Sequence, residues 1–447
     1  MAVAADVVAV PGAVVRGVSR GRSVPSTRVE RHGSVTNIER TRRASGLRVV
    51  TEALPELHSV TLGAWVGSGS RDEQGAEWGA SHFLEHLLFK GTAQRSAREI
   101  AESIESVGGE MNAFTTHEQT VFYVRVPDVQ LEPAFEVLAD VLWNPAFRVD
   151  DVESERRVIL EEIGMRDDTP DDLVHDLFAG AIFPDHPLGR EVLGSDESIT
   201  RMARDDIAAY HAAHYKPSNV VFAAAGNLTH DKVLALADAY FPDGAEVRPP
   251  RPRPDANAPR PVVVLHRDTE QTHVVTGIRA LPSLDPDRYA LTVVNQVLGG
   301  GMSSRLFQEI RETRGLAYSV FSYSASFDDA GYLAIYAGTA SDRVPETLEV
   351  IGAELDRLVK DGLSDSEIAG AKGHLVGSLA MSLETSASRM RRLGRAELVE
   401  GEIPSLEDLV ERVDAVTAVD VSRVIERVLV DAPRTLAVVG PHSASDF

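Results

Sequence analysis

The five residues His82-Phe83-Leu84-Glu85-His86 constrain the fold of this chain more than any other segment. On an α-helix each residue advances by about 100°, so His82 and His86 lie one turn apart on the same face. Two imidazoles placed in this way can bind one zinc ion, at Zn–N distances of about 2.0–2.1 Å. Glu85 lies beside them, where a general base for an attacking water belongs. The spacing therefore predicts a helix that carries a zinc site for hydrolysis of an amide bond.

A short motif of this kind also occurs without a function. The chain contains 14 histidines in 447 residues, and a histidine pair on a helix is often polar surface or a hydrogen-bonded part of a core. A catalytic zinc ion needs three protein ligands and one open position. Because the sequence contains no cysteine, the third ligand must be His, Asp or Glu, and disulfides and a cysteine nucleophile are excluded.

An acidic helix predicted over residues 149–165 offers the missing ligand. Glu155 and Glu162 are seven residues apart and share one helix face, whereas Glu161 points elsewhere. The pair fits one metal ligand and one carboxylate that orients a metal-bound imidazole. Without the histidine motif, a solvated acidic helix face would be the better interpretation of the same pattern.

The composition is that of a soluble globular protein, with 43% hydrophobic and 25% charged residues. The formal net charge of −23 makes nucleic acid a poor partner, because the two would repel each other. Solubility explains this charge more simply than a cavity that attracts basic peptides. No apolar run reaches the length of about 18 residues that a membrane span requires, so we expect no membrane span.

The first 45 residues differ from the rest, with eight arginines against three acidic residues. A secretory signal is not favoured, because the start lacks a basic region and Asp6 and Pro11 interrupt the apolar stretch. An organelle transit peptide is a less favoured alternative, since glycine and proline make an amphipathic helix poor here. We predict a mobile basic extension over residues 1–45. The Arg-, Ala- and Val-rich composition favours a bacterial protein, and we expect it in the cytoplasm.

The remaining chain reads as two similar halves, which predicts an internal duplication. A Pro- and Arg-rich linker covers residues 243–260, and we expect it to be extended and exposed. It separates a domain at 46–242 from a domain at 261–447. Only the first half contains the histidine motif. Because strands cluster before helices in each half, we expect an α+β fold with two mostly antiparallel sheets packed with helices. The predicted strands cover residues 47–54, 59–66, 110–115, 120–126 and 220–225, and then 262–265, 272–278, 317–327 and 332–339.

Longer segments carry a family resemblance. They read GASHFLEHLLFKGT from Gly79, GGEMNAFTTHEQTVFY from Gly108, ERRVILEEI from Glu155, HYKPSNVVFAAAG from His214, LGGGMSSRLF from Leu298 and RETRGLAY from Arg311. With these segments the chain resembles the pitrilysin/insulinase-type zinc metallopeptidases, or inverzincins. It is most similar to the small-subunit branch, which includes the mitochondrial processing peptidase β subunit and bacterial processing proteases. The resemblance extends from residue 46 to the end of the sequence.

The resemblance implies a role for each matching residue of the metal site. His82, His86 and Glu162 match the three zinc (Zn2+) ligands, and Glu85 matches the general base. Glu155 matches the acid that orients a metal-bound histidine.

Two further groups match the substrate-binding residues of the family. Asn112, Ala113 and Phe114 match an edge strand that binds the substrate backbone, and Asn112 can add a side-chain amide contact. A turn residue is the alternative interpretation of Asn112. Arg311 and Tyr318 match a pair that reaches the scissile bond, where Tyr can donate to an oxyanion and Arg can anchor a carbonyl or carboxylate. The alternative is a helix-end arginine and a core tyrosine.

The function that the resemblance implies is zinc-dependent endopeptidase activity on short or unfolded peptides. The substrate would be enclosed between two chains, either a homodimer or a heterodimer with a related chain. The alternative is a non-catalytic partner or peptide-binding subunit of a processing-peptidase-like complex. Such roles usually accompany an eroded zinc motif, whereas this sequence keeps all four residues. Zinc stoichiometry together with a cleavage assay separates these possibilities.

Overall fold

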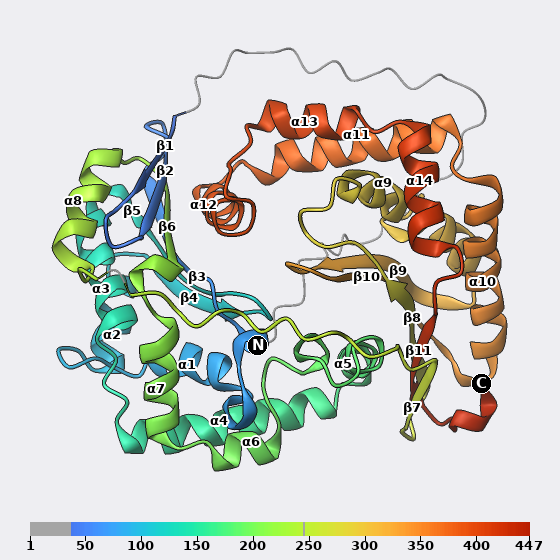
Figure 1. Ribbon diagram of the computed structural model, residues 1–447, viewed down its shortest axis with the longest axis horizontal. Helices are drawn as coiled ribbons and strands as arrows, with labels where there is room; N and C mark the ends of the chain where they lie inside the picture. Colours follow the sequence, from blue (N-terminus) through green and yellow to red (C-terminus); the bar gives the residue numbers. More distant parts are fainter. Residues whose placement is uncertain (1–36, 245) are drawn as a thin grey trace. The chain divides into compact units, whose positions relative to one another are not determined.

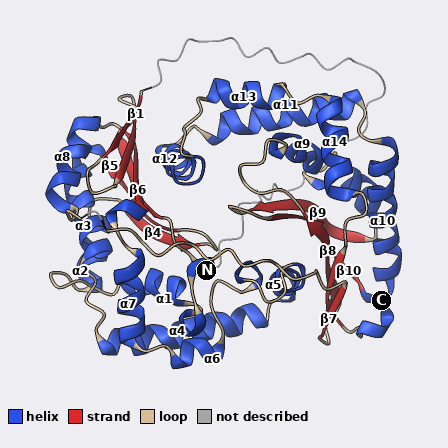
Figure 2. Ribbon diagram, viewed as in Figure 1, coloured by secondary structure: helices blue, strands red, loops and turns tan. Residues whose placement is uncertain are grey.

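The structure is a computed structural model that describes residues 37–244 and 246–447 (Figure 1). In this part the chain forms two β-sheets, each packed with helices, which confirms the expected α+β class (Figure 2). The predicted mobile extension lies outside the described residues as far as residue 36. No helix in the described ranges has the length and apolar character that crossing a bilayer requires.

The first sheet has the strand order β1-β2-β6-β3-β5-β4, so β4 lies at an edge. All neighbours are antiparallel except β2 and β6. Its strands are β1 (Ile38–Arg42), β2 (Arg48–Ala53), β3 (Ser59–Val66), β4 (Glu110–Thr115), β5 (Thr120–Pro127) and β6 (Val220–Gly226). The expected basic extension reached residue 45, yet β1 falls inside it. This strand is polar and has no buried residue, so the sequence carries no apolar alternation that would reveal it.

The second sheet repeats this topology with the order β7-β11-β8-β10-β9. Only β7 and β11 are parallel, as are β2 and β6 in the first sheet. Its strands are β7 (Val262–His266), β8 (Gln271–Arg279), β9 (Ala317–Ser326), β10 (Gly331–Ala340) and β11 (Thr435–Gly440). Strand by strand, β9 therefore corresponds to the edge strand β4. The two sheets thus share one pairing pattern, and β1 is the addition in the first half.

The helices of the first half lie between β3 and β7 in the sequence. They are α1 (Ala80–Leu88), α2 (Ala97–Glu105), α3 (Leu131–Trp143), α4 (Val149–Asp167), α5 (Pro170–Ile182), α6 (Asp196–Arg201), α7 (Arg204–His214) and α8 (His230–Tyr240). The second half contributes α9 (Arg288–Gly299), α10 (Val344–Asp361), α11 (Asp365–Ser382), α12 (Ser386–Arg395), α13 (Leu406–Asp414) and α14 (Ala418–Leu429). A π-helix over Phe307–Thr313 precedes β9.

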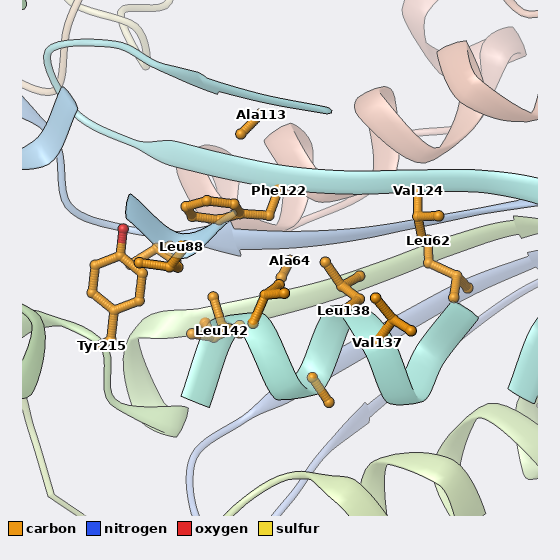
Figure 3. Packing of buried hydrophobic residues seen from close by; sticks show 14 of the residues in the cluster. Leu62, Ala64, Leu88, Ala113, Phe122, Val124, Val137, Leu138, Leu142 and Tyr215 are labelled. Atoms are coloured by element: carbon orange, nitrogen blue, oxygen red, sulfur yellow. The ribbon is translucent and has the colours of Figure 1, made fainter. Parts of the chain in front are cut away.

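The core of the first half lies between the sheet and its own helices. Figure 3 shows Leu62 and Ala64 of β3 near Leu138 of α3, with Phe122 of β5 above them. These residues are fully buried, as the apolar alternation predicts. The other face of β3 is buried too, although an alternation of this kind is typical of a half-buried strand.

Helix α12 explains this second buried face, because it packs on the first sheet although it belongs to the second half (Figure 1). Thr61 and Ser386 hydrogen-bond through their hydroxyls at 2.9 Å, and the Trp65 Nε1–H donates to Met390 Sδ at 3.3 Å. The helix approaches so closely that a Cβ added at Gly394 would overlap the Trp65 indole. Only glycine fits at this contact.

The exchange is reciprocal, because α5 of the first half packs on the second sheet. Val174 and Phe178 of α5 are fully buried in one cluster with Val275 of β8 and Ala437 of β11. The same cluster contains Tyr336 of β10. Each half therefore completes the core of the other half, and neither sheet is covered on both faces by its own half alone.

Buried charges also join the two halves. Arg71 is 0% exposed, and its guanidinium contacts Glu118 and, in the second half, Asp329, both at 2.7 Å. Arg251 of the linker donates to buried Asp72 at 3.1 Å and to the carbonyl of Glu118 at 2.7 Å. The described part of the segment 243–260 contains no helix or strand, and these contacts of Arg251 hold it against the first half.

Candidate active site

The helix that carries the histidine motif is fixed by its apolar side. Phe83, Leu84, Leu87 and Leu88 of α1 are buried in the first core. The polar residues of the motif therefore lie on the opposite side, where they are only partly exposed. This division follows directly from the helical period.

Glu73 holds the beginning of α1. This residue is 1% exposed, and its two carboxyl oxygens accept the backbone N–H groups of Gly79 and Ser81, each at 2.8 Å. Tyr210 Oη lies 2.9 Å from the Ser81 hydroxyl. An acid that binds free N–H groups at a helix N-terminus stabilises that end. Sequence reasoning missed Glu73, and its only signal was an acid in the Gly-rich loop before the helix.

Helices α1 and α4 bring the three expected ligands together. Glu162 Oε2 lies 3.7 Å from His82 Nε2 and 3.5 Å from His86 Nε2. One potential ligand atom from each of the three residues lies within 4.8 Å of the other two. Glu161 is exposed, as its position on α4 predicts.

This donor set fits zinc. Two imidazole nitrogens and one carboxylate oxygen are a common ligand set of hydrolytic zinc sites, and they leave a fourth position open. Burial, together with the neighbouring His86, lowers the pKa of His82 to about 3. His82 is therefore neutral at physiological pH, which is the form that binds a metal.

Glu155 orients His86. Its Oε2 lies 3.1 Å from His86 Nδ1, which leaves Nε2 of the ring directed at Glu162. Lys90 Nζ contacts the other oxygen of Glu155 at 2.6 Å. Burial opposes ionisation of Glu155, but the bonds from His86 and Lys90 outweigh it and hold the pKa of this carboxyl below its ordinary value. Lys90 was not among the residues that the sequence singled out.

Glu85 lies between the ligands and the edge strand. Burial raises the pKa of Glu85, while the hydroxyl of Thr115, the last residue of β4, acts in the opposite direction. Nearby His86 also lowers this pKa, and Glu162 raises it. A carboxylate with a raised pKa, beside a metal site, is suited to accept a proton from water and to return it later.

The three expected substrate-binding residues lie on the edge strand β4. Asn112 pairs with Tyr123 of β5, and Phe114 stacks edge-on against Trp65 with ring centroids 6.0 Å apart. Ala113 is buried toward the first core, on the opposite face. The Ala113 N–H donates to Asn112 Oδ1 at 2.8 Å. The Asn112 side chain thus engages the strand itself, and it is not the turn residue of the alternative interpretation.

Arg311 and Tyr318 contact each other in the second half. The guanidinium of Arg311 lies 4.3 Å from the ring centroid of Tyr318 and donates to its carbonyl at 3.2 Å. Tyr318 is 77% exposed at the beginning of β9, so the alternative interpretation as a core tyrosine is wrong. Tyr318 lies on β9 and Arg311 on the π-helix before it, whereas the three expected metal ligands lie on α1 and α4.

Glu73 should make stability depend on pH. Burial raises its pKa to about 8 from an ordinary 4.5, so the native state binds this proton more tightly than the unfolded state. Its contribution is fully present below pH 4.5 and is lost as the pH rises through about 8, by about 1.4 kcal/mol per unit within this window. We expect the free energy of unfolding of the wild type, relative to Glu73→Gln, to fall between pH 5 and pH 8 in urea titrations.

Chelator in both samples removes any contribution from bound metal to this comparison. A difference between wild type and Glu73→Gln that stays constant from pH 5 to pH 8 would contradict the assignment, because every other titrating group is shared by the two proteins.

Known proteins resemble this chain over nearly its whole length. Residues 48–196 match the family model "Insulinase (Peptidase family M16)", and residues 201–375 match "Peptidase M16 inactive domain". An uncharacterized zinc protease of Streptomyces coelicolor is 44% identical over 96% of this chain and 95% of its own length. An uncharacterized zinc protease of Mycobacterium tuberculosis is 46% identical over 91% of this chain and 93% of its own length. Another, of Bacillus subtilis, is 38% identical over 89% of this chain and 97% of its own length.

Solved structures share the fold. A protease from Helicobacter pylori matches with a TM-score of 0.85 and 24% identity, over 91% of this chain and 100% of that one. A peptidase M16 inactive domain from Pseudomonas fluorescens gives the same TM-score and identity, over 91% and 98%.

Proposed function

Since this chain belongs to peptidase family M16, we propose that it is a zinc-dependent endopeptidase that cleaves short or unfolded peptides. The observation that carries the proposal is the convergence of His82, His86 and Glu162, with Glu85 on the same side of α1. The histidine motif occurs only in the first half of the sequence, so zinc binding and proton transfer belong to that half in this proposal.

Each residue of the site has one task in this proposal. His82, His86 and Glu162 would hold zinc, which supplies Lewis-acid activation of water and of the scissile carbonyl. Glu85 accepts the proton of the attacking water and passes it to the leaving amine. Glu155 keeps the imidazole of His86 in the orientation that binds metal, and Lys90 holds Glu155 in turn.

The edge strand would bind the peptide backbone. Among the described residues β4 has one strand neighbour, β5, so its other side can pair with an extended peptide. Main-chain pairing is largely independent of side chains and requires an extended substrate, which favours short or unfolded peptides. In this proposal Tyr318 donates a hydrogen bond to the developing oxyanion, and Arg311 anchors a substrate carbonyl or carboxylate.

The proposal includes a dimer that encloses the substrate, made of two identical chains or of this chain and a relative, in the bacterial cytoplasm. A homodimer is chemically sufficient, because one chain contains both the metal-site residues and the Arg311–Tyr318 pair. A non-catalytic or peptide-binding subunit remains the competing function, and the experiment below separates it.

Removal of zinc tests the function. We expect the purified protein to contain about one zinc ion per chain by elemental mass spectrometry, as three convergent ligands predict. Hydrolysis of a quenched-fluorescence peptide library should fall to background after treatment with 1,10-phenanthroline and should return when zinc is added. Zinc binding without cleavage would favour the non-catalytic subunit. Cleavage that persists in the metal-free protein would contradict the proposed chemistry.

A further inference from the structure

Two arginines of α12 lack a carboxylate partner in the described part of the chain. Arg391 and Arg395 are exposed and lie one helical turn apart on the same face. By contrast, Arg389 pairs with Glu52, and Arg392 donates to the carbonyl of Pro404. The protein has 68 acidic residues against 45 Lys and Arg, so two neighbouring arginines without an acid reverse the local charge.

Arg391 lies over the sheet next to the edge strand. Its guanidinium carbon is 5.2 Å from the ring centroid of Tyr123 on β5, and its Nη2 lies 3.4 Å from the Tyr123 hydroxyl. Tyr123 pairs with Asn112 on β4, and directly paired residues of antiparallel strands point to the same face. Arg391 therefore lies on the Asn112 face of the sheet. It lies over β5, and the spacing between β5 and the edge strand β4 is about 4.8 Å.

The position of Arg391 is fixed by the packing of α12. The neighbouring Met390 is fully buried against Trp65, and Ser386 hydrogen-bonds to Thr61. A cation over an aromatic ring adds an attraction that orients the guanidinium. The charge thus has a defined place relative to β4, although the helix comes from the other half of the sequence.

A peptide that adds to β4 would present alternate side chains to this charge. Successive residues of a strand point to opposite faces, so every second side chain of the bound peptide lies on the Asn112 and Tyr123 face. The intervening side chains lie on the face of Ala113, which packs toward the first core. A carboxylate is the group that a guanidinium binds best, through charge-assisted hydrogen bonds.

We propose that Arg391, assisted by Arg395, forms a subsite that selects acidic side chains at alternate positions of the peptide substrate. The inference rests on the proposed peptidase function. The net charge of −23 alone would favour basic peptides, but the charges nearest to the bound strand determine selection at this face. On this face Glu110 of β4 is balanced by Arg125 of β5, whose Nη1 lies 3.8 Å from Glu110 Oε1, so the two arginines of α12 make the local charge positive.

A peptide scan tests the subsite. One cleavable peptide is prepared with Glu, Gln or Lys at each position in turn, and the cleavage site is located by mass spectrometry. For the wild type, kcat/KM should be about five-fold higher with Glu than with Gln, the scale of one partly solvated ion pair, and only at every second position. Arg391→Glu should reverse the preference to Lys at those positions, whereas Arg391→Lys should keep it.

Arg267→Glu is the matched control, because this exposed residue follows β7 at the far edge of the second sheet and undergoes the same change of charge. It should leave the preference unchanged. A preference that is equal at all positions, or that survives in Arg391→Glu, overturns the inference while peptide hydrolysis still supports the proposed function.

Binding separates the two proposals. Fluorescence anisotropy of the labelled peptides with Glu85→Gln reports affinity without turnover. If the affinity is higher for Glu at every second position, and Arg391→Glu removes this preference, the subsite is supported. This holds even if the wild type cleaves no peptide, because absence of cleavage would refute only the peptidase function. Equal affinity for the Glu, Gln and Lys peptides would refute the subsite.

Discussion

Glu85→Gln is expected to lower peptide hydrolysis by about 10²- to 10⁴-fold, which is the contribution of a general acid–base residue. Glutamine has nearly the same shape as glutamate but cannot accept the proton of water. Because Glu85 is not one of the three converging ligands, the variant should retain the zinc content of the wild type. The measurement is kcat/KM on a cleavable peptide, together with zinc per chain by elemental mass spectrometry.

Glu161→Gln is the matched control for this variant, since Glu161 is an exposed acid beside the proposed ligand Glu162 on α4. Its activity should equal that of the wild type. If Glu85→Gln retained substantial turnover with zinc bound, Glu85 would not be the base. A joint loss of zinc and activity would instead show that the residue supports the metal site.

The two halves should fail to fold as separate chains. Residues 37–242 alone would expose the apolar face that α12 covers, including Trp65 and Val221. Residues 261–447 alone would expose Val275 and Ala437, which α5 covers. Separation would also break the Arg71–Asp329 ion pair, which leaves buried Arg71 with Glu118 alone. We expect no cooperative thermal unfolding, followed by circular dichroism, for either half, and restored cooperativity when the halves are produced together.

Cutting the intact protein provides the control. A protease site inserted after Asp243, which is exposed and outside any helix or strand, should be cleaved without separating the halves. Independent, cooperative unfolding of either isolated half would contradict the importance of the exchanged helices.

Short-range patterns predicted much of this structure. The alternation in β3 and the helical spacing of the histidine motif are periodic signals, and both elements lie close to where the sequence places them. The seven-residue spacing of Glu155 and Glu162 likewise predicted that they share a face. Such features depend on residues that are neighbours in the sequence, so they can be recognised without a structure.

Other features depend on contacts between distant parts of the chain. Nothing near α12 in the sequence indicates that it covers β3, and burial on both faces of that strand follows only from this tertiary contact. Glu73 binds the beginning of α1 across a loop, and Lys90 reaches Glu155 on another helix. The π-helix before β9 also escaped prediction, because its periodicity over one short segment resembles that of an α-helix.

The exchange of α12 has a consequence for biosynthesis. The last strand of the first sheet ends at Gly226, but the helix that covers its outer face ends at Arg395. At about 5–20 residues per second, a ribosome needs about 10 to 30 s to synthesise the intervening chain. Throughout this interval the first half cannot complete its fold, and Trp65 and its apolar neighbours stay uncovered, so chaperone binding to stalled or truncated chains should concentrate on these strands.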